Sequence, residues 1–401
     1  MRTAITNCNL IDGFSDNPTP DVTVIVDNRH IVDVVPGSSI NTPVDQTIDC
    51  NEGWLLPGLW DVHAHLGFPG PPPEEIINRV IYYGDNAITA MHNYGVTGLR
   101  TVGTDHWIDV AWRDAFASGQ FIGPRIFAGG HFLTTTGGHG LRWPFSKECD
   151  GPIGFAKAIR EEIKHGVDHV KLNLSGGIMG PDWDRHWHSF LLPEELDAAF
   201  RLCRQRDVKV VSHAANAQSV KDALRLGTWT LEHGYIMDDE CIQLLLEKNT
   251  IYVPTLGITH LSPSQATNDW ESRYVESRNI APEFLARADA ASPEHQMWFQ
   301  TALTKGVRMA LGSDLGPLGE GTLLEMGLWV RDGATPMQTI KAATKGGAET
   351  CGQESILGTV ENGKLADMIV VSGNPLEDIA NLRNLQMVFK EGSIVKANQS
   401  S

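Results

Sequence analysis

The 401-residue sequence lacks a long apolar run, an excess of positive charge and a phosphate-binding loop, and each absence excludes a class of function. No run of about 18 apolar residues occurs, so no membrane span is predicted. Lys and Arg number 32 against 49 Asp and Glu, and the net charge of −17 argues against nucleic acid or an anionic membrane as the main partner. Neither GxGxxG nor GxxxxGK[ST] follows a predicted strand, which disfavours nucleotide binding.

Cysteine is also scarce, and its distribution indicates the redox compartment. The six cysteines are scattered and form no CxxC motif, a pattern typical of buried free thiols in a reducing compartment. The first residues lack the apolar segment of a signal peptide. We therefore expect a cytoplasmic protein with a small-molecule substrate.

Short β-strands are predicted at both ends of the chain. Up to about residue 56, and again after about residue 366, runs of β-branched or alternating residues are bounded by Gly, Asn, Asp or Pro. We predict that residues 1–56 and 355–401 together form one small β-sandwich domain.

The region between them, residues 57–354, alternates between short apolar runs and amphipathic helical patterns. The predicted strands lie at residues 59–66, 98–102, 125–128, 169–174, 209–213, 228–233, 251–255 and 308–313. Eight strands separated by helices favour a (β/α)8 TIM barrel, and an open doubly wound α/β sheet is the alternative.

Three loops after predicted strands are long, at residues 129–149, 176–192 and 256–293. In a barrel these loops lie at the carboxyl ends of the strands, where substrates bind. The first two carry aromatic and basic residues, namely Arg142, Trp143, Trp183, Arg185, His186, Trp187 and His188. They predict either a rim for a partly apolar, anionic substrate or ordinary loop packing.

The sharpest chemical signal is the pair His63 and His65 in DVHAH, at the end of the first barrel strand. Residues two apart in a strand point to one face, so both imidazoles can converge on one ion. Neutral imidazole is a common metal ligand. A hydrogen-bonded pair of core histidines has the same spacing, so the pair alone leaves both interpretations open.

Three more polar residues stand at the ends of later strands. His213 ends the fifth strand, His233 ends the sixth and Asp314 follows the eighth. Each has an ordinary alternative, such as a helix N-cap for Asp314. The carboxyl ends of barrel strands share one rim, so the whole set favours a metal site there.

The fourth predicted strand contains Lys171 among apolar neighbours. A buried lysine is costly unless it is paired or neutral. Burial lowers the pKa of a lysine, and the free amine can take up CO2 to form a carbamate that bridges two cations. A snorkelling or ion-paired lysine is the alternative.

Together these motifs resemble the amidohydrolase superfamily of metal-dependent hydrolases. The resemblance covers PGLWDVHAH, VKLNLSGG, SHAAN, EHG, GSD and GTVENGKLADMIVVSGNPLEDI, and so nearly the whole chain. The chain is most similar to the imidazolonepropionase-like branch, with its prolidase-type Xaa-Pro and Xaa-Arg dipeptidases and ochratoxin-cleaving amidases. The resemblance implies a barrel with a terminal β domain, hydrolase activity and a homo-oligomer.

The resemblance also implies roles for individual residues. Of two divalent ions, zinc before manganese or cobalt, one would be held by His63, His65 and Asp314, the other by His213 and His233, with carbamylated Lys171 as the bridge. A hydroxide between the ions would attack the amide carbonyl, and Asp314 would transfer the proton. His139, in the loop after the third strand, would contact the substrate, with Tyr235 and Arg142 as further substrate-binding residues.

The expected reaction is cleavage of the amide bond in a dipeptide or N-acyl amino acid, with aryl amides, ureas, carbamates and lactams as alternatives. The alternative is a mononuclear deaminase. Deaminases of this superfamily resemble one another in an acidic residue shortly after the strand-five histidine, but here His213 is followed by Ala-Ala-Asn216. A deaminase would also give Lys171 no role. A metal-free interaction protein is the third hypothesis. One departure from the family pattern is Glu320, which replaces a histidine often found after the strand-eight Asp and so bears on the substrate.

Overall fold

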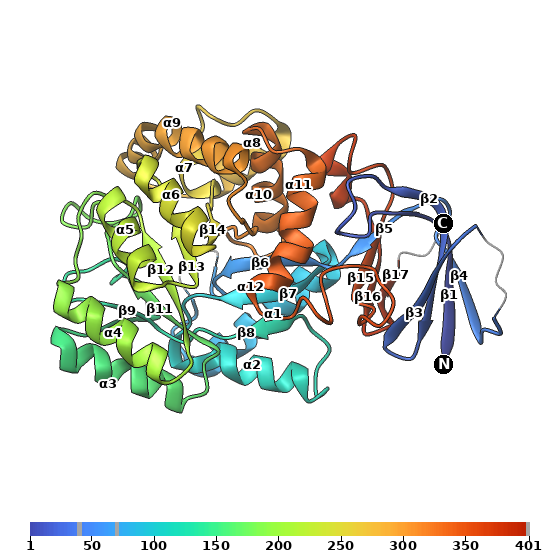
Figure 1. The fold of residues 1–401 in the computed structure, drawn as a ribbon, viewed down its shortest axis with the longest axis horizontal. Helices are drawn as coiled ribbons and strands as arrows, with labels where there is room; N and C mark the ends of the chain where they lie inside the picture. The colour runs from blue at the N-terminus through green and yellow to red at the C-terminus, as the bar shows by residue number, and fades with distance from the viewer. Residues whose placement is uncertain (38–41, 69–71, 398–401) are drawn as a thin grey trace.

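The computed structural model describes residues 1–37, 42–68 and 72–397, and it places strands from both chain ends side by side at one end of the molecule (Figure 1). These strands are β1 (Arg2–Leu10), β2 (Thr19–Asp27), β3 (His30–Pro36), β4 (Gln46–Asp49), β5 (Trp54–Pro57), β15 (Met368–Val371), β16 (Leu385–Lys390) and β17 (Ser393–Ala397). They form one eight-stranded sheet in the order β17-β16-β15-β5-β1-β2-β3, with β4 also paired to β1.

The two termini are joined at β5 and β15, which pair antiparallel with Met368 opposite Pro57. Alternate residues of β2, Val22, Val24 and Val26, point to one face and are buried there with Phe389 from β16. Strands from both ends of the chain therefore form one sheet with a shared core, as their predicted pairing requires.

Parallel strands make up the barrel: β6 (Leu59–Ala64), β7 (Val96–Thr101), β8 (Arg125–Phe127), β11 (His169–Asn173), β12 (Lys209–Ala214), β13 (Thr230–His233) and β14 (Ile251–Val253). Two short strands, β9 (Phe132–Thr134) and β10 (Ser146–Glu148), follow β8 in the sequence. β9 pairs with β11, and β10 pairs with β9. Strands β6–β8 form one arc and β10-β9-β11-β12-β13-β14 form the other.

The eighth barrel strand, predicted at residues 308–313, is not a regular strand. Met309 makes a single parallel bridge to Tyr252, whose N–H donates to the Arg308 carbonyl at 2.9 Å. On the other side the Val62 N–H donates to the Leu311 carbonyl at 3.0 Å. The segment is thus bonded to both β14 and β6 and closes the barrel, although irregularly.

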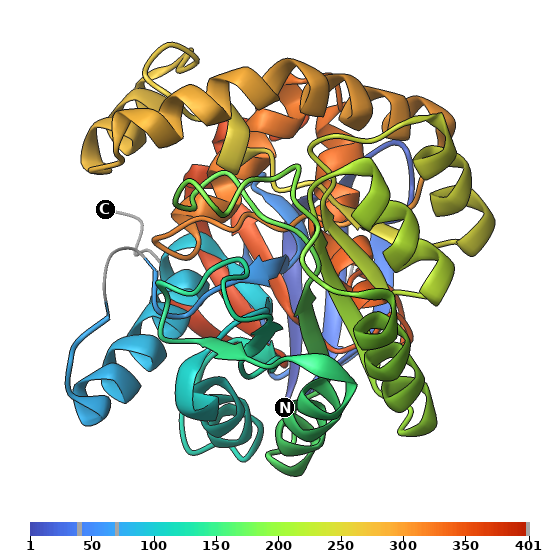
Figure 2. The same ribbon diagram turned by 90° about the vertical axis from the view of Figure 1, so that its left-hand side faces the viewer.

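Helices surround the barrel strands, as Figure 2 shows. They are α1 (Ile76–Tyr94), α2 (Ile108–Ala117), α3 (Gly151–Lys164), α4 (Pro193–Gln205), α5 (Ala217–Leu226), α6 (Asp239–Lys248), α7 (Gly257–His260), α8 (Asp269–Ser277), α9 (Pro282–Lys305), α10 (Glu320–Arg331), α11 (Pro336–Lys341) and α12 (Gly347–Thr350). The prediction of a loop over residues 256–293 was wrong, because α7, α8 and the start of α9 occupy much of it. Its polar composition hid these helices, which bury polar residues such as His260 in α7 and Glu271 in α8.

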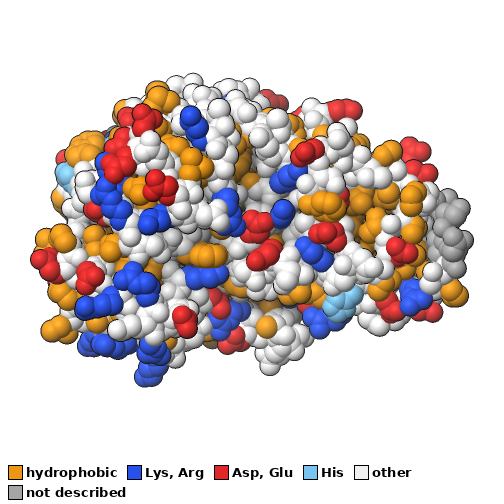
Figure 3. All heavy atoms as spheres, in the orientation of Figure 1, with side chains coloured by type: hydrophobic (Ala, Val, Ile, Leu, Met, Phe, Trp, Pro, Cys, Tyr) orange, Lys and Arg blue, Asp and Glu red, His pale blue; other side chains and the backbone are white. Residues whose placement is uncertain are grey.

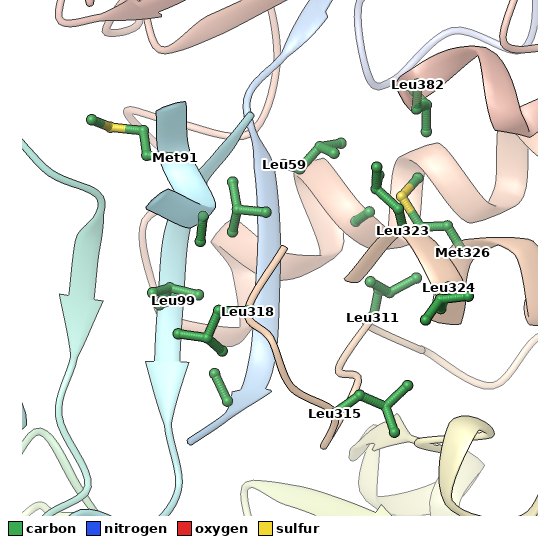
Figure 4. Packing of buried hydrophobic residues seen from close by; sticks show 14 of the residues in the cluster. Leu59, Met91, Leu99, Leu311, Leu315, Leu318, Leu323, Leu324, Met326 and Leu382 are labelled. Atoms are coloured by element: carbon green, nitrogen blue, oxygen red, sulfur yellow. The ribbon is translucent and has the colours of Figure 1, made fainter. Parts of the chain in front are cut away.

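The largest hydrophobic cluster joins the barrel to the C-terminal segment (Figure 4). Leu59 on β6 and Leu99 on β7 are fully buried in it, together with Met326 on α10. Leu382, in the 3₁₀ turn Ile379–Arg383, belongs to the same cluster. The barrel therefore shares its packing with the chain that returns to the terminal sheet.

Five of the six cysteines are buried free thiols and Cys351 is partly buried, close to the expectation. On the face drawn in Figure 3, Lys and Arg side chains lie among Asp and Glu. None of the helices in the described ranges combines the length and apolar character needed to cross a bilayer.

Candidate metal centre and active site

The side chains singled out at the strand ends meet at one rim of the barrel. The ring centroids of His63 and His65 are 5.7 Å apart, and His63 lies 4.9 Å from His233. His213 lies 4.3 Å from His233. Asp314 Oδ1 is 3.2 Å from His65 Nε2 and 3.7 Å from His63 Nε2.

Three of these residues offer ligand atoms close enough for one cation. Donor atoms of His63, His233 and Asp314 all lie within 4.8 Å of one another. His233 and Asp314 have left-handed backbone, with φ of 74° and 54°, and so does Thr255, at 53°, which contacts His233. Such backbone costs on the order of 1–3 kcal/mol per residue and clusters at functional sites.

Each of the four imidazoles uses one ring nitrogen for a hydrogen bond within the protein. The partners are Glu232 Oε2 for His63 Nδ1 at 2.6 Å, the Gly103 carbonyl for His65 Nδ1 at 3.1 Å, the Gly176 carbonyl for His213 Nε2 at 3.0 Å and Thr255 Oγ1 for His233 Nδ1 at 2.8 Å. Metal-binding histidines show this pattern, because the bonded nitrogen fixes the tautomer and leaves the other as ligand.

Burial keeps the rings of His63, His213 and His233 neutral. It lowers the pKa of His63 to about 4, with the Lys171 charge acting in the same direction. Burial, followed by the neighbouring His139 and His213 respectively, lowers the pKa of His213 and His233 well below the usual value. A neutral imidazole binds a cation and a protonated one does not, so this donor set fits divalent ions.

Lys171 on β11 is only 3% exposed. Burial lowers its pKa to about 8, while Glu232 and Asp314 oppose that shift. The Lys171 charge in turn lowers the pKa of His63, His213, His233 and Asp314, and β11 pairs with β12, the strand that carries His213. The pKa leaves about a tenth of the amine neutral at pH 7, and the neutral amine is the form that reacts with CO2.

Sequence reasoning missed the ion pair between Glu232 and Arg100, both at least 98% buried behind His63. Arg100 Nη2 donates to Glu232 Oε1 at 2.8 Å. Burial opposes the charge of Glu232, but Arg100 and His63 lower its pKa well below the usual value. The signal in the sequence was an acid two residues after Thr230 within an apolar strand, on the same inward face.

Asp61 stands two residues before His63, and the sequence did not reveal its structural role. Its carboxylate is fully buried and accepts hydrogen bonds from the N–H groups of His63 and Ser313, at 3.1 and 3.0 Å. It also accepts from the hydroxyls of Ser313 and Thr322, at 2.6 and 2.9 Å. Asp61 therefore ties β6 to the segment that ends at Asp314.

His139 stacks on His213, with ring centroids 4.3 Å apart and an interplanar angle of 26°. Asp184 accepts from its Nδ1 at 2.8 Å, so the Nε2 edge is left for other partners. A Cβ on Gly177 would lie 2.3 Å from His139 Cε1, so only glycine permits this approach. The loops at 129–149 and 176–192 are thereby locked together beside the second pair of histidines.

An aromatic wall, defined as Phe68, Trp143 and Phe145, stands beside His65. Phe145 stacks on the His65 ring at 5.0 Å and on Trp143 at 5.8 Å. The Arg142 guanidinium lies 4.7 Å from the Trp143 ring and 5.2 Å from the Phe284 ring. Burial lowers the pKa of Arg142, with Asp184 opposing, but an arginine stays charged at neutral pH, so the site has a cation over aromatic rings.

Tyr235 and Glu320, which were expected to affect substrate binding, both make contacts within the protein. Tyr235 is 2% exposed, and its hydroxyl lies 3.2 Å from His233 Nδ1, so its observed contact is with a histidine. Glu320 pairs with Arg383 at 2.7 Å, so its charge is neutralised from the C-terminal segment. Trp183 and Trp187 are exposed on the second loop.

Comparison with known proteins identifies the family of the chain. Residues 54–395 match the amidohydrolase family. Ochratoxinase of Aspergillus niger is 28% identical over 384 residues, which cover 85% of this chain and 75% of that protein. Imidazolonepropionase of Acinetobacter baumannii is 21% identical and covers 86% of each chain.

Among solved structures, a Xaa-Pro dipeptidase with bound methionine superposes with a TM-score of 0.86 at 29% identity, over 99% of this chain and 100% of that one. The family resemblance drawn from the motifs is thus confirmed, and so is the barrel with its terminal β strands. The chain belongs to the amidohydrolase family and is an enzyme that hydrolyses carbon–nitrogen bonds.

Proposed function

We propose that the chain is a binuclear metal-dependent hydrolase that cleaves the amide bond of a small substrate, such as a dipeptide or an N-acyl amino acid. The observation that carries this proposal is the meeting of five side chains at one rim, with the buried Lys171 on the adjacent strand β11. The five are His63, His65, His213, His233 and Asp314. The Xaa-Pro dipeptidase and ochratoxinase relatives support an amide substrate.

The donor set suggests how two ions would be shared. His63, His65 and Asp314 would hold one ion, His213 and His233 the other, and a carbamate on Lys171 would bridge them. Imidazole and carboxylate ligands suit zinc, with manganese or cobalt as substitutes. Bound cations would supply Lewis acidity and a hydroxide nucleophile at neutral pH.

The chain's own residues position the substrate and move the proton. Although burial opposes it, His63 and His65 lower the pKa of Asp314, so this carboxylate is ionised and accepts a proton at the reaction centre. Passing that proton to the leaving nitrogen completes hydrolysis. His139, oriented by Asp184, would contact the substrate carbonyl, and Arg142 would pair with a substrate carboxylate.

The aromatic wall favours aryl amides as a second substrate class. Phe68 and Trp143 are partly exposed beside the buried Phe145, which stacks on His65, and offset stacking on the exposed rings favours planar groups. Ureas, carbamates and lactams also carry a planar carbonyl group. A substrate with an aryl group on one side and a carboxylate on the other would match both the wall and Arg142.

A mononuclear deaminase is disfavoured by the role of Asn216. This residue stands where a deaminase of this superfamily would carry an acid, and it instead caps α5 by accepting from the Ser219 N–H at 3.0 Å. It also donates to the His186 carbonyl. The Asn216 side chain therefore has a structural role, as a helix cap and a donor to the neighbouring loop.

Three expectations remain proposals alongside this function. Domain boundaries after residues 56 and 354 are supported by sheet strands that fall within 2–57 and 368–397. Free thiols support a cytoplasmic location. The family resemblance supports a homo-oligomer.

The proposal is tested by screening metal-loaded protein against a library of dipeptides, N-acyl amino acids and aryl amides. We expect hydrolysis of at least one class, two metal ions per chain, and loss of activity without unfolding in His63→Ala and Asp314→Ala. Wild-type turnover in either variant would contradict the proposed centre, and a single bound ion would contradict its binuclear form.

A further inference from the structure

Behind the metal centre, three strands are held together by one buried ion pair. Glu232 on β13 uses Oε2 to accept from His63 Nδ1 at 2.6 Å and Oε1 to accept from Arg100 Nη2 at 2.8 Å. Glu232 is fully buried and Arg100, on β7, is 2% exposed. Both carboxylate oxygens are engaged, so Glu232 lies next to the site without being free to bind a cation.

Arg100 reaches all three strands because of its planar, forked donor group. Its Nε donates to the Val62 carbonyl on β6 and its Nη1 to Thr230 Oγ1 at 2.7 Å, and Thr230 also bonds to Glu232. A lysine ammonium cannot match this fixed geometry. The guanidinium thus holds β6 next to β13 at the level of His63.

The Glu232 carboxylate determines which of its two neutral tautomers the His63 ring adopts. A carboxylate accepts but cannot donate, so it selects the tautomer with the proton on Nδ1 and leaves the Nε2 lone pair facing Asp314. We propose that Glu232 and Arg100 form a positioning pair that fixes the tautomer and orientation of His63 and thereby sets the cation affinity of the His63–His65–Asp314 site. This inference rests on the proposed metal centre and adds residues that are not ligands.

A cavity at the other end of the barrel extends to the buried Arg100. Arg100 lines this cavity of about 180 Å³ together with His169, Lys209 and Trp229, which lie at or just before the amino ends of β11, β12 and β13. Asp207, on the rim of this cavity, is exposed. A small guanidinium ion can therefore reach the place of a truncated Arg100 without passing the metal centre.

The first test is Glu232→Gln, with ion binding measured by competition with a chromophoric chelator for zinc or cobalt. The amide either donates to His63 and forces the tautomer that cannot ligate through Nε2, or turns its NH2 group toward Arg100. Loss of such an indirect partner lowers metal affinity by about 10–100-fold. We expect that loss at one of the two ions, with the His213–His233 ion retained and a changed cobalt absorption spectrum.

The matched control is Glu162→Gln, which also alters a fully buried carboxylate. Glu162 accepts from Trp107 Nε1 at 2.6 Å and lies 3.2 Å from His131 Nδ1, away from the ligands named above. We expect a lower unfolding temperature of the metal-free protein in both variants, but weaker ion binding only in Glu232→Gln. Equal ion affinity in the two variants would overturn the inference.

The second test is Arg100→Ala with added guanidinium. We expect one ion to bind weakly and millimolar guanidinium chloride, but not sodium chloride, to restore its affinity. If Arg100→Ala does not fold, Glu232→Gln still decides the matter. If the wild-type protein binds no divalent ion, the proposed function fails; if it binds two and Glu232→Gln binds both unchanged, only the positioning pair fails.

Discussion

Replacing Asp61 should uncouple the two segments that carry His63, His65 and Asp314. Asp61 Oδ1 accepts from the backbone N–H groups of His63 and Ser313, and Oδ2 accepts from the hydroxyls of Ser313 and Thr322. All of these groups are buried. Two substitutions, Asp61→Ala and Asp61→Asn, separate the loss of hydrogen bonds from the loss of charge.

The magnitudes follow from counting donors. Asp61→Ala leaves two buried backbone N–H groups without an acceptor, at about 1–3 kcal/mol each, so the unfolding free energy should fall by about 2–6 kcal/mol. In Asp61→Asn the amide oxygen still accepts from both N–H groups, and the NH2 group donates to the two hydroxyls, which rotate to accept. Only the charge assistance is lost, which is about 1–2 kcal/mol.

The assay is urea unfolding of the metal-free protein, followed by metal content after reloading. We expect a severe loss of stability and of bound metal in Asp61→Ala, and a mild loss of both in Asp61→Asn. Equal losses in the two variants would show that the charge of Asp61, and not its hydrogen bonds, matters. An unchanged Asp61→Ala would refute the reasoning altogether.

Three further predictions concern activity. Lys171→Ala should lose hydrolysis that short carboxylic acids partly restore by replacing the carbamate, and full activity without them would remove the carbamate from the proposed centre. Arg142→Ala should lower kcat/KM about 10–100-fold for substrates with a free carboxylate, because it removes a charge-assisted hydrogen bond of about 1.5–3 kcal/mol. The kcat/KM of their amidated analogues should not change. Equal effects on both substrates would show that Arg142 does not bind the carboxylate. Chelation should abolish activity and lower the unfolding temperature, because bound ions stabilise only the folded state; active, equally stable chelated protein would contradict a metal centre.

Much of the fold could be predicted from local patterns. Seven of the eight predicted barrel strands overlap regular strands, and helices lie between them, as the amphipathic patterns predict. The eighth predicted strand is an irregular segment and not a strand. Its hydrogen bonds to β14 and β6 form at isolated residues, which the periodicity of the sequence does not reveal. The 256–293 region failed for a similar reason, since tertiary packing decides whether a polar segment becomes helical.

By itself, the sequence determined the family, the barrel, the placement of histidines and Asp314 at strand ends, and that of Lys171 inside a strand, because these depend on short motifs and on two-residue alternation. Only the tertiary structure decided which groups stand behind them. Arg100 meets a carboxylate 132 residues away, Glu232 meets a histidine 169 residues away, and Glu320 is neutralised by Arg383. Such partners are chosen by how strands close into a barrel, and no local pattern of residues encodes that distance.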